Sequence, residues 1–405
     1  TLSPMALGVR RALALRRATV GASIVALGLA GAAAPASASV FSAQFELSTL
    51  ATGDGSAGFV LNGIDTGDRS GYSVSAAGDV NGDGLDDVVI GAQRADPGGR
   101  EDAGESYVVF GGAARLSALD AADGTTDAAI NLSALNGLNG FRLDGVDPAD
   151  NSGVVVSDGG DLKGDGFDDI LIGASGADTT DFVFFNGGTT TTIVNAGETY
   201  VIFGDDFTGA VTHQGSETAD VLIGDASANI MIGGLGDDVL DGNGGADVQK
   251  GGAGDDEHRV GDAGFARIQG GSGQDSLVLD GTFDVNLSWL SPDMVTGIET
   301  IDITGTGANT LTMTFQDLVD LAGSSNESLE TSGFAGPLSS RNLVVDGDGA
   351  DTFVFDPIPA GNASAGGTWT LVGQTSFDGE TYDVYNYELA GSLLGSLAID
   401  EDIIV

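Results

Sequence analysis

Alternating oxygen-bearing side chains in the segment DVNGDGLDD can together bind a metal ion. The candidate ligands are the side chains of Asp79, Asn81, Asp83 and Asp87 and the backbone carbonyl of Leu85. Oxygens at alternate positions of a loop bent by Gly84 converge on one point, and Ca²⁺ prefers a cage of about six to eight oxygens. Position 12, where an EF-hand requires Glu, is Ile90, and apolar runs flank the loop. We therefore predict a strand–loop–strand calcium site; the alternative is an acidic turn without metal.

The same loop occurs a second time, because residues 58–95 align without a gap to residues 140–177 at an offset of 82. Its candidate ligands are the side chains of Asp161, Asp165 and Asp169 and the carbonyl of Phe167. Lys163 places an ammonium group where the first loop has the amide of Asn81. This charge either weakens the metal site or replaces the ion as an internal counter-charge. The second copy also carries an insertion in a Thr-rich stretch near 181–196, which we expect to be a solvent loop.

A different spacing of acids begins at Gly215, where Gly-rich nonads follow one another: GSETADVLI, GDASANIMI, GGLGDDVLD, GNGGADVQK and GGAGDDEHR. Val260 interrupts the series, and two more nonads follow it. The sixth positions carry the candidate metal ligands Asp220, Asn229, Asp238, Asp247, Asp256 and Asp275. Gln249 and His258 break the apolar series at the eighth positions, so we expect a loosened or kinked coil near 249–260. The alternative for this region is a disordered Gly/Asp-rich linker.

The duplicated segment resembles the FG-GAP repeat of integrin α-subunit β-propellers and of many bacterial surface proteins. The aromatic-Gly and Gly-Ala-Pro motifs of this family correspond here to Gly71-Tyr72, Gly91-Ala92-Gln93 and Gly173-Ala174-Ser175. The Pro of the family motif is missing from both copies. The resemblance covers about residues 44–207 and implies propeller blades with calcium loops. Because propellers have about 4–8 blades, two cannot close a ring. The region is then an open pair packed on its neighbours, an oligomer-forming half, or a remnant of a longer ancestor.

The nonads strongly resemble the RTX, or hemolysin-type, calcium-binding repeats. The resemblance implies a parallel β-helix (an RTX β-roll) in which two nonads complete one coil and Ca²⁺ lies between stacked turns. One side of the roll then carries Asp220, Asp238, Asp256 and Asp275, and the other carries Asn229, Asp247 and Ala266. Because unpaired buried charge is costly, Ca²⁺ is expected to act as a folding partner.

Composition narrows the classes of partner. The chain has 60 acidic against 14 basic side chains and a formal net charge of −46. This charge argues against nucleic acids and anionic membranes, and it favours multivalent cations as counter-ions. The sequence has no Cys, which excludes disulfides, thiolate metal sites and thiol catalysis. Two unpaired histidines, with neither a His-Glu-x-x-His nor a Gly-x-Ser-x-Gly motif, predict a protein that is not an enzyme.

Short alternating apolar and polar runs predict an all-β fold, with helical stretches only around 126–136 and 315–322. An acid-free, Arg-containing segment that ends in Ala36-Ser37-Ala38 predicts a signal peptide; the alternative is an N-terminal anchor helix. After its removal we expect no integral membrane segment. The predicted organisation is a signal peptide at 1–38, FG-GAP repeats at 39–139 and 140–212, an RTX β-roll at 213–279 and a β-rich C-terminal domain at 280–405.

These features together predict a secreted or cell-surface protein that binds Ca²⁺ and serves adhesion or surface and matrix attachment. Surface glycans or proteins are the partners to expect besides calcium ions, and an oligomer is possible because two blades leave a propeller open. Two alternatives remain: an accessory or degenerate module of a secreted hydrolase, and a fragment of a larger surface protein.

Overall fold

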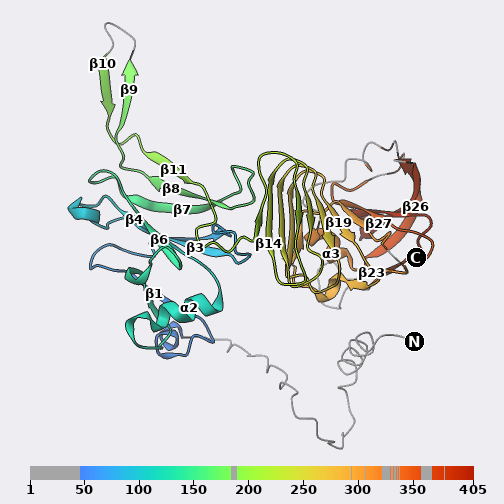
Figure 1. Ribbon diagram of the computed structural model, residues 1–405. Coiled ribbons are helices and arrows are strands. Elements are labelled where there is room, and N and C mark those ends of the chain that lie inside the picture. Colours follow the sequence, from blue (N-terminus) through green and yellow to red (C-terminus); the bar gives the residue numbers. More distant parts are fainter. Residues whose placement is uncertain are drawn as a thin grey trace, which may run out of the picture. The chain divides into compact units, whose positions relative to one another are not determined.

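The computed structural model describes residues 46–405 except 184–188, 293, 306, 322–328, 330–331, 333, 335, 337, 357–366 and 378. Residues 48–405 form one unit. The expected signal peptide at 1–38 lies outside the described residues. Strands dominate the described chain, so the prediction of an all-β fold is confirmed (Figure 1).

The first repeat forms a four-stranded antiparallel sheet in the order β2-β3-β4-β6. Its strands are β2 (Ser73–Gly78), β3 (Asp87–Ala92), β4 (Glu105–Val109) and β6 (Gly140–Asp144). The acid loop 79–87 connects β2 to β3. The strand β6 lies in the sequence of the second repeat but completes the sheet of the first, which ties the two copies together.

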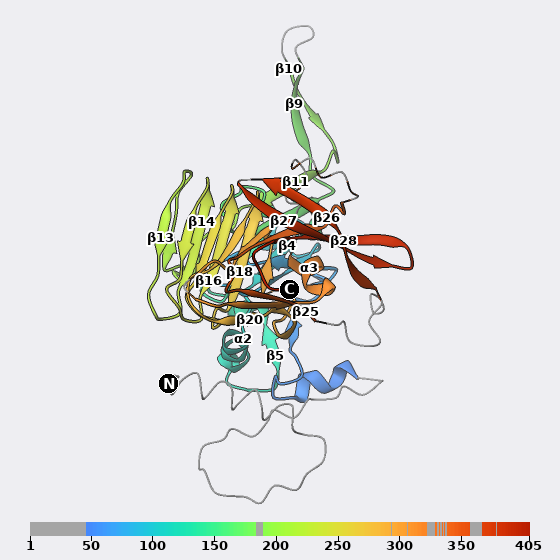
Figure 2. The same ribbon diagram turned by 90° about the vertical axis from the view of Figure 1, so that its right-hand side faces the viewer.

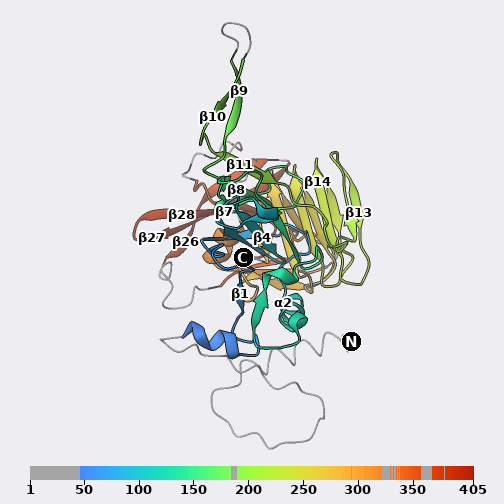
Figure 3. The same cartoon turned by 90° about the vertical axis from the view of Figure 1, so that its left-hand side faces the viewer.

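Around this sheet lie the parallel strands β1 (Val60–Asn62) and β5 (Ala129–Asn131), the helix α2 (Ala113–Asp120) and four 3₁₀ turns (Figure 3). The 3₁₀ turns are η1 (Leu47–Thr52), η2 (Pro97–Gly99), η3 (Ala121–Asp123) and η4 (Leu132–Ala134). The expected helix around 126–136 is therefore wrong. Ala128 has φ +60°, which an α-helix forbids, and residues 129–131 pair in parallel with β1 before the short turn η4 begins at Leu132.

The second repeat forms a three-stranded sheet in the order β11-β8-β7. Its strands are β7 (Ser152–Gly160), β8 (Asp169–Ala174) and β11 (Glu198–Ile202). The pairing repeats that of the first copy residue for residue: Val74 faces Ile90, and Val156 faces Ile172, each shifted by 82. In place of the expected solvent loop, the insertion contains the antiparallel strands β9 (Thr179–Val183) and β10 (Thr189–Ile193).

The two repeat sheets share one apolar core. It consists of Ala77, Val80, Val89, Val108, Phe110, Val156, Ile170 and Ile172, which come from both copies. Phe110 also stacks on Phe207 with ring centroids 6.2 Å apart. The two blade-like units therefore bury their apolar faces against each other.

The nonads form two parallel sheets whose strands stack along the roll (Figure 2). The strands are β12 (His213–Gln214), β13 (Val221–Ile223), β14 (Ile230–Leu235), β15 (Val239–Asp241), β16 (Val248–Ala253), β17 (Glu257–Val260), β18 (Arg267–Ser272) and β19 (Ser276–Leu279). Ile230 pairs with Val248, so one coil takes 248 − 230 = 18 residues, or two nonads. Beyond β16 the step grows to 19, because Val260 adds one residue. The repeats thus form the parallel β-roll that they predict.

Gln249 and His258 do not loosen the coil, so that expectation is wrong. Both side chains are fully buried, and the ladders run through them from Met231 to Gln249 to Ile268. His258 Nδ1 lies 3.2 Å from Gln249 Oε1, and Gln249 Nε2 donates to the carbonyl of Arg259 at 3.0 Å. The two polar residues that break the apolar series therefore contact each other in the interior of the roll, while His258 Nε2 has no hydrogen-bond partner among the described residues.

Replacing Gln249 and His258 together by leucine is expected to reduce the acid sensitivity of the roll. Burial lowers the pKa of His258 to about 3, from an ordinary value of 6.5. Below pH 6.5 the unfolded chain binds a proton that the folded chain does not, so wild-type stability falls as the pH drops toward 3. Thermal melts at equal calcium between about pH 4.5 and 6.5 should show a shallower loss for the double variant. Equal slopes would contradict a buried neutral His258.

The C-terminal residues continue the coil and then close it. The elements are β20 (Asp284–Asn286), η5 (Leu287–Trp289), β21 (Val295–Thr296), β22 (Thr300–Asp302), β23 (Thr310–Met313), α3 (Phe315–Leu321), β24 (Asn342–Asp346), β25 (Thr352–Phe355), β26 (Thr368–Phe377), β27 (Glu380–Leu389) and β28 (Ser392–Asp400). The roll sheet extends through β19-β22-β24-β28 in parallel and ends in the antiparallel strands β27 and β26. The helix α3 agrees with the predicted helical stretch at 315–322, and Phe315 stacks on Tyr387 in the core of this cap.

Candidate metal centre

The two acid loops share one hydrogen-bond frame. Asp87 is buried; its Oδ1 accepts the N–H of Gly111 at 2.8 Å and its Oδ2 that of Val80 at 3.1 Å. Asp169, at the equivalent position, accepts the N–H of Gly204 at 3.0 Å and of Leu162 at 2.8 Å. Burial raises the pKa of Asp87 to about 7, partly offset by the Gly111 N–H. The last acid of each loop thus joins the loop to the residues that follow strand β4 or strand β11.

The first acid of each loop holds the bend. Asp79 accepts the N–H of Asp83 at 3.0 Å and of Gly84 at 2.7 Å. Asp161 accepts the N–H of Asp165 at 3.1 Å and of Gly166 at 2.7 Å. Gly84 and Gly166 have φ +82° and +81°, a conformation that favours glycine. The equal geometry explains why the acids and glycines recur at the same spacing.

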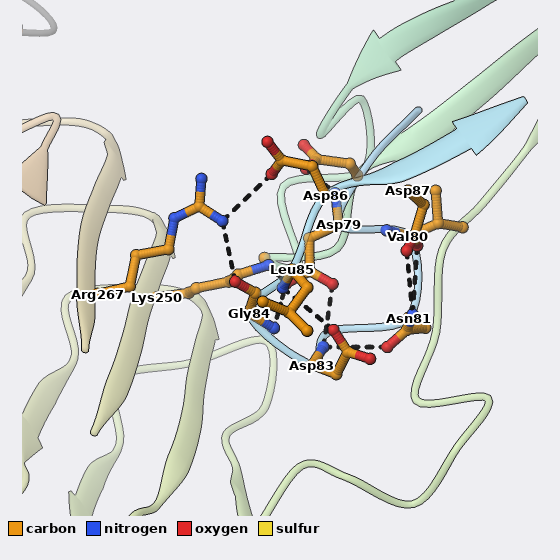
Figure 4. A network of polar contacts seen from close by, with 12 residues as sticks. Asp79, Val80, Asn81, Asp83, Gly84, Leu85, Asp86, Asp87, Lys250 and Arg267 are labelled. Atoms are coloured by element: carbon orange, nitrogen blue, oxygen red, sulfur yellow. Dashed lines mark hydrogen bonds and ion pairs between the residues drawn. The ribbon is translucent and has the colours of Figure 1, made fainter. Parts of the chain in front are cut away.

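The remaining predicted ligands of the first loop also contact protein donors (Figure 4). Asn81 Nδ2 donates to Asp87 Oδ2 at 3.2 Å, and Asn81 Oδ1 accepts the N–H of Asp83 at 3.1 Å. Asp83 Oδ2 forms an ion pair with Arg115 at 2.6 Å. Leu85, the predicted carbonyl ligand, has a side chain that is 47% exposed and an N–H that donates to Asp83.

Each of the two acid loops forms an ion pair with a lysine ammonium group. Lys250 Nζ of the roll forms a buried ion pair with Asp79 Oδ2 at 2.5 Å, and Lys163 Nζ pairs with Asp165. A cation of the protein thus already contacts one acid of each loop, and a Ca²⁺ ion would have to share that acid with it. Calcium ligation by Asp79, Asn81, Asp83, Leu85, Asp87, Asp161, Asp165, Phe167 and Asp169 stays a prediction.

The sixth-position acids on one side of the roll stack into a column. The N–H of Asp220 donates to Asp238 Oδ1 at 2.7 Å, and the N–H of Asp238 donates to Asp256 Oδ1 at 2.8 Å. The N–H of Asp256 in turn donates to Asp275 Oδ1 at 2.9 Å. Oδ1 of Asp238, Asp256 and Asp275 therefore accepts a backbone N–H from the preceding coil, and Oδ2 does not take part in this contact.

That second oxygen is buried and unpartnered in three acids. Among the described residues, Oδ2 of Asp238, of Asp256 and of Asp275 has no hydrogen-bond partner. Each lies close against a glycine and near a backbone carbonyl: a Cβ on Gly251 would lie 2.2 Å from Asp256 Oδ2 and 2.4 Å from the carbonyl oxygen of Gly270. The same convergence occurs at Gly233 with Asp238, and at Gly270 with Asp275. Carboxylate and carbonyl oxygens gathered in this way fit a hard cation such as Ca²⁺.

Burial dominates the electrostatics of this column. Desolvation raises the pKa of Asp256 to about 7 and that of Asp275 to about 8, and it raises the pKa of Asp238 as well. Neighbouring acids of the column raise these pKa values further. A cation is the partner that such a stack lacks, since it removes the repulsion and replaces the lost hydration.

The other predicted ligands of the roll are less well placed to bind a metal ion. Asp220 is half-buried, and its Oδ2 accepts both the N–H and the hydroxyl of Ser216 at 2.7 Å. On the opposite side, the N–H of Asn229 donates to Asp247 Oδ1 at 2.8 Å, and the series ends at Ala266, whose N–H donates to the Asp247 carbonyl. The structure thus brings Asp238, Asp256 and Asp275 together as the strongest candidate metal ligands. The opposite side of the roll has fewer stacked acids, because its series runs from Asn229 through Asp247 to Ala266.

Sequence reasoning missed Glu299. Its Oε2 accepts the N–H of Asp275 at 2.9 Å, so Glu299 continues the acid column beyond the last nonad. It lies 299 − 275 = 24 residues further on, which breaks the period of 18 and conceals it from a repeat search. The signal available in the sequence was the Gly-x-Glu at 297–299 directly before a strand. Lys250 and Arg267, which contact the first loop, carried no such signal.

No cluster of three or more His, Cys, Asp or Glu side chains suited to a metal occurs in the part of the chain that the structure describes. Backbone carbonyls must therefore complete any site in the roll. Over the same residues, no helix has the length and apolar character needed to cross a bilayer.

Comparison with protein families agrees with this geometry. The FG-GAP repeat model matches residues 70–109, and the RTX calcium-binding nonapeptide repeat model, which describes four copies, matches residues 214–249. No curated protein matches the chain. The matches include loop 79–87 and the first half of the acid column. The chain therefore carries an FG-GAP repeat followed by RTX calcium-binding nonapeptide repeats.

Proposed function

We propose that this chain is a non-catalytic, calcium-binding protein of the cell surface or extracellular space, that Ca²⁺ drives its folding, and that it serves adhesion or surface attachment. One observation carries the proposal: the column Asp238, Asp256, Asp275 buries three carboxylates, each with an oxygen that has no partner among the described residues. FG-GAP and RTX repeats are both typical of proteins outside the cell, which supports the location.

Physical chemistry links this column to the place of folding. A buried carboxylate without a partner costs several kcal/mol, and a ligand at about 100 times its Kd returns about 2.7 kcal/mol per site. Extracellular calcium modules bind in the range of about 10⁻⁴–10⁻³ M. The chain would accordingly stay open at cytosolic calcium and close after export. This order also avoids passing a folded roll through an export channel.

The histidines support a non-catalytic role. His258 lies in the core of the roll, where burial lowers its pKa to about 3, so its ring has no access to a substrate. His213 lies on the first strand of the roll, with Nδ1 2.9 Å from its neighbour Thr212 Oγ1. With His258 buried and no Cys in the sequence, only His213 is left as the base of a Ser–His relay, and a Cys–His relay lacks its nucleophile.

Circular dichroism and melting curves of the full chain in EGTA, and then in rising Ca²⁺, test the folding claim. We expect a cooperative gain of β signal at micromolar to millimolar Ca²⁺, with Mg²⁺ much weaker because it demands a stricter octahedral geometry. A chain that folds fully in EGTA and ignores Ca²⁺ would refute calcium-driven folding.

Binding to surfaces tests the proposed role in adhesion or surface attachment. Calcium-loaded chain should bind immobilised surface glycans or whole cells and be released by EGTA. The alternative, a module of a hydrolase, predicts release of sugar or fatty acid from those surfaces. Turnover that is lost on replacing a carboxylate outside the loops and the roll would favour that alternative.

A further inference from the structure

The two lysines of this sequence, Lys163 and Lys250, each place an ammonium group at one of the two acid loops. They differ in setting. The side chain of Lys163 is 52% exposed and contacts its own loop, whereas that of Lys250 is 5% exposed and comes from strand β16 of the roll. In a chain with a net charge of −46, a buried lysine needs a specific reason to be there.

Lys250 lies beside Asp79 of the first repeat (Figure 4), and its charge also acts on Asp168 of the second repeat. Its Nζ pairs with Asp79 Oδ2, and the N–H of Asp79 donates to Asp168 Oδ2 at 2.7 Å. Burial raises the pKa of Asp168, and the charge of Lys250 partly offsets this. One ammonium group therefore neutralises a site to which each repeat contributes a carboxylate.

A second basic residue of the same roll sheet repeats this arrangement. Arg267 on β18 contacts Asp86 Oδ1 at 3.2 Å and the carbonyl of Gly84 at 3.1 Å. Asp86 is the counterpart of Asp168 in the first repeat, since 86 + 82 = 168. The roll thus presents Arg267 to Asp86 by direct contact, whereas Lys250 contacts Asp79 and acts on Asp168 through its charge.

Glycines at the loop tips allow this close approach. A Cβ on Gly84 would lie 2.8 Å from Val248 Cγ2 of the roll, and one on Gly166 would lie 2.5 Å from Ile232 Cγ2. A Cβ on Gly164 would lie 2.8 Å from Leu235 Cδ2. Both loops are therefore packed directly on the sheet that carries Lys250, and the side chains of the ion pair are only 5% and 2% exposed.

A divalent ion in loop 79–87 would have to share Asp79 with the buried ammonium group of Lys250. Like charges at this distance in a poorly hydrated site repel strongly, so one cation excludes the other. We propose that Lys250 is the resident cation of the loop Asp79–Asp87, which holds this ammonium group in place of Ca²⁺ and thereby joins the first repeat to the calcium-binding roll. The proposal deepens the calcium-dependent folding proposed above and rests on it for the state of the roll.

Counting bound calcium tests which cation the loop holds. Equilibrium dialysis of the full chain with radioactive Ca²⁺ should show one more ion in Lys250→Met than in wild type, and the extra ion should be lost in Lys250→Met/Asp79→Asn. Arg267→Met is the matched control, because it removes the other roll cation from the same loop but leaves Lys250 on Asp79. Equal counts in wild type and Lys250→Met would overturn the proposal, as would a wild-type count that drops in Asp79→Asn.

Acetylation of the wild-type lysines keeps the test decisive if Lys250→Met does not fold. With Ca²⁺ bound, Lys250 should react about tenfold more slowly than the exposed Lys163, and in EGTA the two should react alike once the roll opens. Equal reactivity in calcium would overturn the proposal. Protection of Lys250 in both conditions, with the β signal unchanged by EGTA, would instead refute calcium-driven folding and leave Lys250 in the loop.

Discussion

Asp256→Asn is expected to change the stability of the roll in opposite directions with and without calcium. In Ca²⁺ the variant loses one negative charge at the centre of the acid column, so the calcium midpoint should rise by about tenfold or more, roughly 1.4 kcal/mol. Without calcium the variant should melt at a higher temperature than wild type, because an amide costs less to bury than an unpartnered carboxylate. Calcium titrations followed by circular dichroism and paired thermal melts measure both effects.

Asp255→Asn is the matched control for this substitution. Asp255 is the preceding residue of the same turn but is exposed, and an asparagine oxygen can still accept the N–H of Gln274 as Asp255 does at 2.9 Å. Its effect on the calcium midpoint should be small. If Asp255→Asn and Asp256→Asn shift the midpoint equally, the effect comes from net charge and the buried column is not the calcium site.

The second large effect is a reversal of the pH dependence of stability by calcium. In the metal-free chain, burial raises the pKa of Asp256 to about 7 and that of Asp275 to about 8, against an ordinary value of 3.8. The folded chain then keeps protons that the unfolded chain has released. Stability is therefore fully present below pH 3.8 and falls as the pH rises through 7 and 8, by about 1.4 kcal/mol per pH unit for each carboxyl that is still protonated.

The window from about pH 7 to 8.5 suits this measurement, because His258 is neutral there in the folded chain and mostly neutral in the unfolded chain, where its ordinary pKa is 6.5. Melting temperatures of chain stripped of metal should fall across it, and more steeply for wild type than for Asp256→Asn. In saturating Ca²⁺ the carboxylates are needed in the charged form, so stability should hold level or rise with pH. A metal-free melting temperature that rises with pH across this window would contradict buried, protonated acids in the column.

Much of the fold is readable from local sequence. A sixth-position acid and an eighth-position apolar residue every nine residues allow few arrangements, and the observed step of 18 between paired strands follows from two nonads per coil. The duplicated segment likewise predicted two equal loops, and Asp79 and Asp161 do hold the same pair of backbone N–H groups. These interactions span a few residues, so spacing along the chain specifies them.

Other features depended on contacts that spacing does not encode. Gln249 and His258 interrupt the apolar series at two separate positions along the chain, yet in the roll they contact each other. Glu299 joins the acid column only because the coil continues past the last nonad. In each case a polar group that looks unsuitable along the chain acquires a partner in space.

The sequence by itself determined where the acids stand: their identity and spacing specify two Gly-bent loops and, in nonads of the RTX calcium-binding type, a stack of carboxylates. Only the tertiary structure decided which acids lack a partner. Asp79 meets Lys250, 171 residues further along the chain, whereas Asp256 Oδ2 has no partner within the described residues. The physical reason is that an acid's need for a metal depends on burial and on the nearest cation, and both are set by packing between distant segments.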